Sequence, residues 1–255
     1  MLDIHSHILP GIDDGSKSME QTVEMLKLTE ADDVKTIIAT SHFYRGYYEN
    51  RYEDIKKLVE KVKTRAREES INLDIIPGQE VMLDHRSLED YKKGEIGCIG
   101  GTDYMLVELP MMDMPRDALD IIYELEIRGI HPILAHPERY RYIMDKPSKI
   151  NEFLNEKCLI QVNTGSIMGM FGKKVRNTAR ILIKNGICSF IASDAHSTGG
   201  RCPGISSALE TASEINHNMP LYMEKNCDRL LKNQLIDPVS ERIKEKKGIF
   251  NFFRT

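Results

Sequence analysis

Seven short apolar runs recur along this chain, and most of them end at a histidine, an aspartate or a glutamate. They begin roughly every 25 to 40 residues, at 2–7, 36–42, 73–80, 104–109, 131–136, 159–164 and 188–194. The charged stretches between them carry apolar residues at helical spacing, as in 52–62 and, after Pro115, in 119–126. The order of elements is therefore strand, helix, strand, repeated along the whole chain.

This alternation restricts the fold to the α/β class. Alternating units with nearly continuous apolar strands form a parallel sheet covered by helices, and seven units in 255 residues favour a closed or nearly closed barrel. An open doubly wound sheet is the alternative, although no Gly-x-Gly-x-x-Gly follows the first run, which weakens its nucleotide-binding form. We expect a single domain over residues 1–236 and a C-terminal tail over 237–255.

His5 and His7 stand two positions apart in the first run. In an extended strand alternate side chains share a face, so both imidazoles project from one side, about 7 Å apart along the backbone. Two imidazoles placed in this way can bind one metal ion. An acid and an imidazole have the same spacing at the end of the last run, at Asp194 and His196. Two such pairs near opposite ends of the chain indicate one shared site.

Side chains that can bind metal also stand at or near the ends of most of the other apolar runs. Because the carboxyl ends of the strands in a β/α barrel converge on one face, residues far apart in sequence become neighbours there. Together with Asp14 from the first loop, the candidates are five histidines and four carboxylates: His5, His7, Asp14, His42, Glu80, Glu108, His136, Asp194 and His196. One ion takes three or four protein ligands, so nine indicate two or three ions that share bridging carboxylates.

Neighbouring residues compete with these ligands or support them. Asp13 and Asp14 compete for one role, and Asp3 points to the face of the histidines, where it can orient an imidazole. The remaining histidines do not end apolar runs, and we assign them to the surface or to packing: His85, His131 and His217. The joint occurrence of ligands at strand ends, rather than any single residue, carries the metal hypothesis.

Composition and cysteine spacing exclude other functions. The formal net charge of -4 leaves no basic footprint for nucleic acid, and the absence of a leader or a long apolar stretch predicts a cytoplasmic protein. The five cysteines are scattered, which fits reduced thiols. A cysteine-dependent tyrosine phosphatase needs an arginine six positions after its thiolate, and those positions hold Tyr104, Thr164, Asp194, Ala208 and Asn233.

Six motifs resemble those of the polymerase-and-histidinol-phosphatase (PHP) superfamily. They are His5-Ser6-His7, Asp13-Asp14-Gly15, Ser41-His42, Gly78-Gln79-Glu80, Ala-His-Pro-Glu-Arg at 135–139 and Ser-Asp-Ala-His at 193–196. From residue 1 to about 235 the chain more closely resembles the bacterial manganese-dependent protein-tyrosine phosphatases encoded with capsule and exopolysaccharide genes. The segments that carry this closer likeness are 4–10, 106–108, 133–139 and 191–196.

That resemblance implies a distorted (β/α)7 TIM-like barrel, the PHP fold, which holds three divalent ions. The ions are manganese by analogy, with iron and zinc as alternatives, since all three accept shells of histidine and carboxylate. By analogy the first ion takes His5, His7, Glu80 and Asp194. The second shares Glu80 and adds Glu108 and His136, and the third takes Asp14, His42 and His196.

A cluster of this kind hydrolyses phosphoesters directly. It lowers the pKa of a bound water from 15.7 toward ~7, and a metal-bridging hydroxide then attacks phosphorus without a covalent intermediate. The resemblance further implies that Arg139 and Arg201 hold the phosphoryl group, with a less complete match in the loop of Arg201. Planar guanidiniums suit that role, because they bind two phosphoryl oxygens at once and stabilise charge as it develops.

The resemblance implies a phosphotyrosine substrate on a bacterial tyrosine autokinase with a tyrosine-rich tail, which controls capsule or exopolysaccharide synthesis. Four tyrosines follow His42 and can wall a site for an aromatic ring, or can be ordinary loop and helix residues: Tyr44, Tyr47, Tyr48 and Tyr52. Two alternatives stay open. One is a PHP-type phosphatase of small molecules such as histidinol phosphate, and the other is a non-catalytic binding module stabilised by its ions.

The C-terminal tail is basic at Lys244, Lys246 and Lys247 and then aromatic at Phe250, Phe252 and Phe253. We expect a flexible tail or one that packs its aromatic rings on the domain. Contact with an anionic membrane surface or with a partner protein is the alternative.

Overall fold

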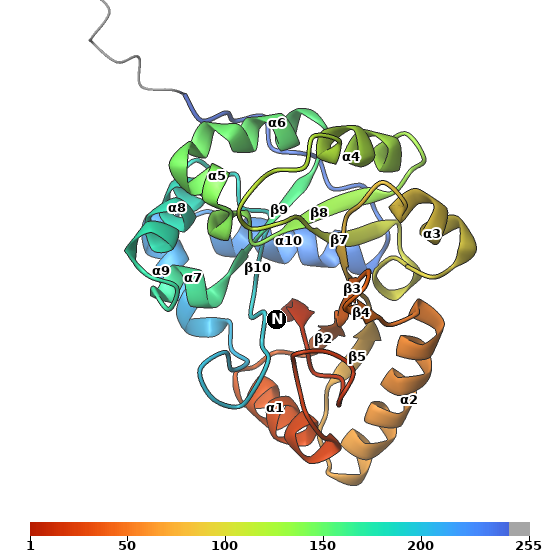
Figure 1. Cartoon of the computed structure of the whole chain (residues 1–255). Coiled ribbons are helices and arrows are strands. Elements are labelled where there is room, and N and C mark those ends of the chain that lie inside the picture. The colour runs from red at the N-terminus through yellow and green to blue at the C-terminus, as the bar shows by residue number, and fades with distance from the viewer. Residues whose placement is uncertain (245–255) are drawn as a thin grey trace, which may run out of the picture.

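The computed structural model describes residues 1–244, which form a mixed α/β fold with helices around two sheets (Figure 1). The smaller sheet is parallel, in the order β1 (Leu2–Ser6), β2 (Thr36–Ala39) and β5 (Asp74–Pro77). The larger sheet runs β10 (Phe190–Ala192), β9 (Leu159–Asn163), β8 (His131–Ala135), β7 (Tyr104–Glu108), β6 (Glu80–Met82), β3 (His42–Tyr44) and β4 (Tyr48–Glu49). Its pairs are parallel except for the antiparallel hairpin of β3 and β4.

All seven predicted strands are confirmed, but two of them are broken. The second run divides into β2 and β3 at Thr40 and Ser41, and the third divides into β5 and β6 at Gly78 and Gln79. The backbone passes close to a neighbour at this second break, since a Cβ on Gly78 would lie 2.7 Å from Ile38 Cγ2. Each broken strand begins in the small sheet and continues in the large one. The strands of residues 1–244 therefore divide into two sheets rather than one closed sheet.

The first and last strands of the chain meet between the two sheets. Ser6 and Ala195 form an isolated parallel bridge. His7 N donates to Ala195 O, and Asp194 N donates to His5 O, each over 2.8 Å. This pairing places the N-terminal histidines beside the acid and imidazole that follow the last strand.

Two helices cover the small sheet. Apolar residues of α1 (Met19–Ala31) and α2 (Tyr52–Glu68) pack with β2, β5 and the segment after β1 in a core of their own, which includes Leu26, Ile37, Val59 and Ile75. α1 begins where the hydroxyl of Ser18 accepts a hydrogen bond from Gln21 N over 3.3 Å. The helical spacing noted at 52–62 is confirmed by α2, whose buried residues follow it.

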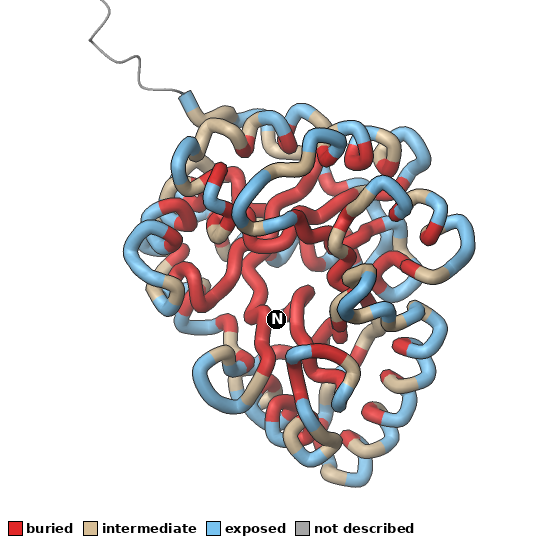
Figure 2. Tube along the Cα trace, in the orientation of Figure 1, coloured by how far each residue is buried: buried red, intermediate tan, exposed pale blue. Residues whose placement is uncertain are grey.

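The remaining helices surround the large sheet and enclose a second apolar core. They are α3 (Ser87–Lys93), α4 (Ala118–Glu126), α5 (Arg141–Asp145), α6 (Ile150–Asn155), α7 (Thr164–Met168), α8 (Lys173–Lys184), α9 (Ser206–Ile215) and α10 (Met219–Leu231), with 3-10 turns η1 (Ile99–Gly101), η2 (Pro137–Arg139) and η3 (Pro147–Lys149). Figure 2 shows the strands buried in the interior and the exposed residues on the outer faces of the helices. Among the described residues no helix is both long enough and apolar enough to cross a membrane.

The first part of the predicted tail lies along α6. Ile243 N donates to Asn151 Oδ1 over 3.0 Å, and Asn151 Nδ2 donates to Ile243 O over 2.9 Å. Arg242 Nε donates to Asn155 Oδ1 over 3.1 Å. The rest of the predicted tail, with the basic and aromatic residues from Lys246 onward, lies outside the described residues, and so do the expectation that it is flexible or packs on the domain and the alternative of membrane or partner contact.

Candidate metal centre

All nine predicted ligands come together at the strand ends. Asp14 comes from the loop between β1 and α1, seven others stand at strand termini or within two residues of them, and His196 follows the end of β10 by four residues. Seven of the nine line a cavity of about 270 Å³: Asp14, His42, Glu80, Glu108, His136, Asp194 and His196. His5 and His7 are fully buried beside them. The expected convergence of residues from both ends of the chain is therefore present.

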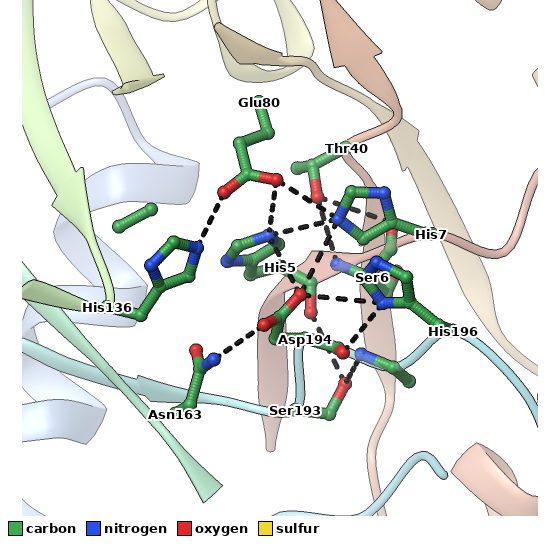
Figure 3. Close-up of polar contacts among 12 residues, drawn as sticks. His5, Ser6, His7, Thr40, Glu80, His136, Asn163, Ser193, Asp194 and His196 are labelled. Carbon is green, nitrogen blue, oxygen red and sulfur yellow. Dashed lines mark hydrogen bonds and ion pairs between the residues drawn. The ribbon is translucent and has the colours of Figure 1, made fainter. Parts of the chain in front are cut away.

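His5 and His7 face one another at the centre of this group, with their Nε2 atoms 3.2 Å apart (Figure 3). Glu80 Oε2 lies 3.2 Å from each of these nitrogens. Asp194 Oδ1 lies 3.4 Å from His5 Nε2 and 3.6 Å from His7 Nε2. Both histidines project from the same side of the strand, as their spacing predicts, and four ligand atoms converge on one small volume.

His136 and Glu108 extend the group past Glu80. His136 Nε2 lies 2.8 Å from Glu80 Oε1 and 3.6 Å from Glu108 Oε1. His42 Nδ1 lies 3.1 Å from Glu80 Oε2 and 3.9 Å from Glu108 Oε2. Glu80 thus faces ligand atoms with both of its oxygens, which is the arrangement that a bridging carboxylate requires.

Asp14 forms a third group with His42 and His196. Its Oδ1 lies 3.4 Å from His42 Nε2 and 3.3 Å from His196 Nε2, and the Asp14 side chain is 45% exposed. His42 therefore presents one ring nitrogen to this group and the other to Glu80. The ion pairs with both imidazoles outweigh burial and lower the pKa of Asp14 to about 2, so it is a carboxylate at neutral pH.

Asp13 and Asp14 do not compete for one role. Asp13 Oδ2 lies 2.9 Å from His7 Nδ1, on the side of the ring that faces away from the cluster. The same oxygen accepts from His42 N over 3.1 Å, and Asp13 Oδ1 accepts from Gly15 N over 2.9 Å. Asp13 therefore orients His7, and it does so from a turn that directs Asp14 toward the other histidines.

The prediction that Asp3 orients an imidazole is wrong. Its Oδ1 accepts hydrogen bonds from two backbone nitrogens, His5 N over 3.3 Å and Ser193 N over 3.0 Å. Asp3 stands two residues before His5 along the strand, and Gln161 Oε1 occupies the place beside His5 Nδ1 at 2.9 Å.

Gln161 was not among the predicted site residues, and neither was Asn163, whose Nδ2 donates to Asp194 Oδ2 over 2.5 Å.

The cluster has the electrostatics of a cation site. Burial, together with the carboxylates of Glu80 and Asp194, raises the pKa of Glu108 well above its usual range. Asp194 Oδ1 is buried and accepts no hydrogen bond from any described residue. A buried carboxylate oxygen without a partner is costly, and a cation there would satisfy it. Four overlapping groups of ligand atoms, each within 4.8 Å, provide the donor set that such an ion needs.

Two of the ligands stand on unusual backbone. The φ angle is 36° at His136 and 53° at Asp194, in the left-handed region that residues other than glycine rarely adopt. Each such residue costs about 1–3 kcal/mol and is typical of functional sites. Because the chain turns sharply just after β8 and β10, both side chains enter the cavity.

Arg139 and Arg201 also line the cavity. Arg139 Nη1 lies 3.1 Å from Asp194 Oδ2, and Arg201 Nη2 lies 2.5 Å from the same oxygen. The Arg139 guanidinium packs over the ring of Phe171 at 4.6 Å. Arg201 O accepts from His196 N over 2.8 Å, so a short turn ties this loop residue to a ligand. Two guanidiniums therefore approach the cluster from different loops.

Two of the four tyrosines after His42 reach the cavity. Tyr44 and Tyr48 line it, and the Tyr48 ring stacks on His42 with 5.8 Å between centroids. Tyr47 stacks on Tyr44 at 4.4 Å and is 73% exposed. Tyr52 begins α2 and packs against the backbone of Gly97, away from the cavity. The predicted aromatic wall is therefore formed by the β3–β4 hairpin alone.

A family model described as capsular polysaccharide synthesis, CpsB/CapC, matches residues 1–232. The chain belongs to the CpsB/CapC family. It is 32% identical over 254 residues to the tyrosine-protein phosphatase YwqE of Bacillus subtilis (strain 168). This match covers 99% of this chain and 100% of YwqE. The family resemblance drawn from the sequence motifs is confirmed.

Solved structures agree with this membership. A chain from the structures of YwqE from Bacillus subtilis and CpsB from Streptococcus pneumoniae, described as unique metal-dependent tyrosine phosphatases, superimposes with a TM-score of 0.92 at 31% identity. The match covers 96% of this CpsB/CapC chain and 100% of that one. Histidinol phosphate phosphatase from Lactococcus lactis, solved with zinc, L-histidinol and phosphate, gives a TM-score of 0.54 at 12% identity over 89% and 94% of the two chains. That likeness shows a shared fold.

Proposed function

We propose that this CpsB/CapC chain is a metal-dependent tyrosine phosphatase that hydrolyses phosphotyrosine in proteins. The observation that carries the proposal is the convergence of nine histidine and carboxylate side chains, seven of them lining one cavity together with two guanidiniums. The full-length similarity to YwqE supports the same activity. Its cysteines support no thiol route, since four are buried and none of the five is followed six positions later by an arginine.

We assign three divalent ions to the cavity, manganese first, with iron or zinc as alternatives. The first would be held by His5, His7, Glu80 and Asp194. The second would share Glu80 and use Glu108 and His136, and the third would use Asp14, His42 and His196. The short distances within each set, and the position of Glu80 between two of them, support this assignment.

Bound divalent ions would supply an activated water and polarise the phosphoryl oxygens. The chain's own part is to bind and orient the phosphoryl group. Arg139 and Arg201 are partly exposed on the cavity wall and both carry planar donors, so we assign them to hold the equatorial oxygens and stabilise developing charge. A phenolate has a parent pKa near 10, so it leaves with less proton donation than an alkoxide. Tyr44 and Tyr48 would flank the leaving ring.

We propose a tyrosine autokinase of capsule or exopolysaccharide synthesis as the physiological substrate. The family description names capsular polysaccharide synthesis, and a tyrosine phosphatase in that process needs a kinase that phosphorylates the same protein. The cytoplasm is the compartment in which such a kinase would be dephosphorylated.

We also propose that the two sheets together form a distorted (β/α)7 barrel over residues 1–236. The bridge between Ser6 and Ala195 supports closure between the first and last strands. The breaks at Thr40–Ser41 and Gly78–Gln79 would be the distortion, because they pass two strands from one sheet to the other. Residues 237–255 would form a separate tail whose first part follows α6.

The test compares kcat/KM on a phosphotyrosine peptide with that on histidinol phosphate and on sugar phosphates, in parallel with metal analysis of the purified protein. We expect the peptide to be preferred and divalent metal to be present. Preference for histidinol phosphate would indicate the small-molecule phosphatase instead. Bound metal without release of phosphate from any substrate, even with added manganese, would indicate the binding module.

A further inference from the structure

Of the seven apolar runs identified in the sequence, only 159–164, which forms β9, contains no candidate metal ligand. Its carboxyl end carries two amides instead, Gln161 and Asn163, which are two residues apart and share a face. Both side chains are fully buried. Gln161 Nε2 donates to Asn163 Oδ1 over 2.8 Å, so the two amides form a linked pair beside the metal centre.

The orientation of the Gln161 amide determines which nitrogen of His5 is protonated. The backbone nitrogen of His136 can only donate, and it lies 3.3 Å from Gln161 Oε1, which must therefore be an acceptor. His5 Nδ1 lies 2.9 Å from the same oxygen and must carry a hydrogen to bond to it. In the neutral ring His5 Nε2 then keeps its lone pair, and this nitrogen faces Glu80 and Asp194.

The Asn163 amide orients Asp194 in the same way. Because its oxygen accepts from Gln161, its Nδ2 must be the group that meets Asp194 Oδ2 over 2.5 Å. This contact leaves Asp194 Oδ1 turned to the cluster, 3.4 Å from His5 Nε2 and without a hydrogen-bond donor among the described residues. Figure 3 shows Asn163 on the opposite side of Asp194 from His7 and His196.

We propose that Gln161 and Asn163 are positioning residues that prepare the first metal site before an ion arrives. The pair holds His5 in the tautomer that can bind metal and holds Asp194 in the rotation that presents Oδ1 to the same point. The two amides are neutral, so they add no charge to the cluster. This inference rests on the metal centre proposed above, and its test separates the two.

The experiment strips metal from four proteins with a chelator and then titrates each with Mn²⁺ by calorimetry. The four are the wild type, Gln161→Ala, Asn163→Ala and the control Asn226→Ala. Asn226 is also a buried amide, and its Nδ2 donates to Ser189 O over 3.0 Å outside the cavity. We expect Mn²⁺ affinity to fall roughly 10- to 100-fold in each β9 variant and to stay at the wild-type value in Asn226→Ala. Gln161→Glu, which keeps the acceptor for His5 and His136, should recover part of the loss.

A folded Gln161→Ala protein with wild-type Mn²⁺ affinity, or an equal loss in Asn226→Ala, would overturn the inference. If the alanine variants do not fold, ¹⁵N NMR of the imidazoles in chelated wild-type protein decides, at a pH high enough for the His5 ring to be neutral, because the proposal then requires hydrogen on His5 Nδ1 and none on Nε2. Wild-type protein that binds no Mn²⁺ at all would instead overturn the metal centre itself.

Discussion

Arg139 Nη1 lies 3.1 Å from Asp194 Oδ2, so a guanidinium assigned to the phosphoryl group touches a carboxylate assigned to a metal ion. The two roles can be separated, because Asp194 Oδ2 also accepts from Asn163 and Arg201 and does not depend on Arg139 for its position.

We therefore expect Arg139→Ala to lower kcat/KM on a phosphotyrosine peptide by about 10²- to 10³-fold, as loss of one charge-stabilising donor does elsewhere. Bound metal, measured by mass spectrometry, should stay at the wild-type amount. The matched control is Arg141→Ala, because Arg141 is an exposed arginine that faces Asp145 outside the cavity. Metal content that fell in parallel with activity would show that Arg139 supports the ions instead.

Chelation and thiol alkylation should have opposite effects. Four cysteines are buried, and burial raises the pKa of Cys98 and Cys227 to about 12, so these thiols react slowly at neutral pH. Only Cys202 is exposed. We expect a chelator to abolish phosphate release and added Mn²⁺ to restore it, while iodoacetamide labels one site and leaves activity in place. Cys202→Ser serves as the control, and loss of activity on labelling that variant would contradict the metal route.

Glu138 should make the ion-free protein less stable as pH rises. Burial raises the pKa of this fully buried carboxyl from 4.5 to about 7. Between those values the folded state holds a proton that the unfolded state has lost, so the free energy of unfolding falls with rising pH, by roughly 3 kcal/mol in all.

The side chain of the variant Glu138→Gln stays neutral at every pH. The variant should therefore lack this part of the fall in the free energy of unfolding with rising pH. Urea unfolding of chelated protein at about pH 5 and about pH 8 measures it. The difference between variant and wild type isolates Glu138 from other titrating groups, and identical slopes in the two proteins would disprove the effect.

Gly15 should tolerate no side chain. A Cβ there would lie 2.2 Å from His7 O and 2.4 Å from His7 Cβ. Gly15→Ala must therefore displace His7 or the turn that holds Asp13, and we expect it to lose about 1–3 kcal/mol of stability and to bind Mn²⁺ more weakly. Gly200→Ala is the control, since nothing lies within 4 Å of its Cβ position. Thermal unfolding and calorimetry of both variants check this expectation, and equal behaviour would refute it.

The strands and the gathering of the ligands could be predicted because both depend on local periodicity. His5 and His7 follow the two-residue period of a strand, and parallel strands bring their ends to one face. The breaks at Thr40–Ser41 and Gly78–Gln79 were not predicted, although Pro77-Gly78 in the third run is a turn signal. They depend on tertiary packing, such as the close approach of Gly78 to Ile38.

The roles of neighbouring polar residues also escaped prediction. Asp13 and Asp14 are chemically identical, and only the turn closed by Gly15 N assigns one to His7 and the other to His42 and His196. A signal for the β9 pair was present, because Gln161 and Asn163 interrupt an apolar run at the same two-residue spacing as His5 and His7. Amides are not metal ligands of choice, so the search for ligands passed over them.

The contact between Ser6 and Ala195 joins segments that are made at opposite ends of translation. Two of the four groups of ligand atoms include Asp194 or His196. These two groups cannot form until the segment that follows β10 has left the ribosome. A nascent chain shortened before residue 194 would keep His5, His7 and Glu80 but would leave their pocket open on one side. The full set of candidate ligands therefore comes together only when nearly the whole polypeptide has been synthesised.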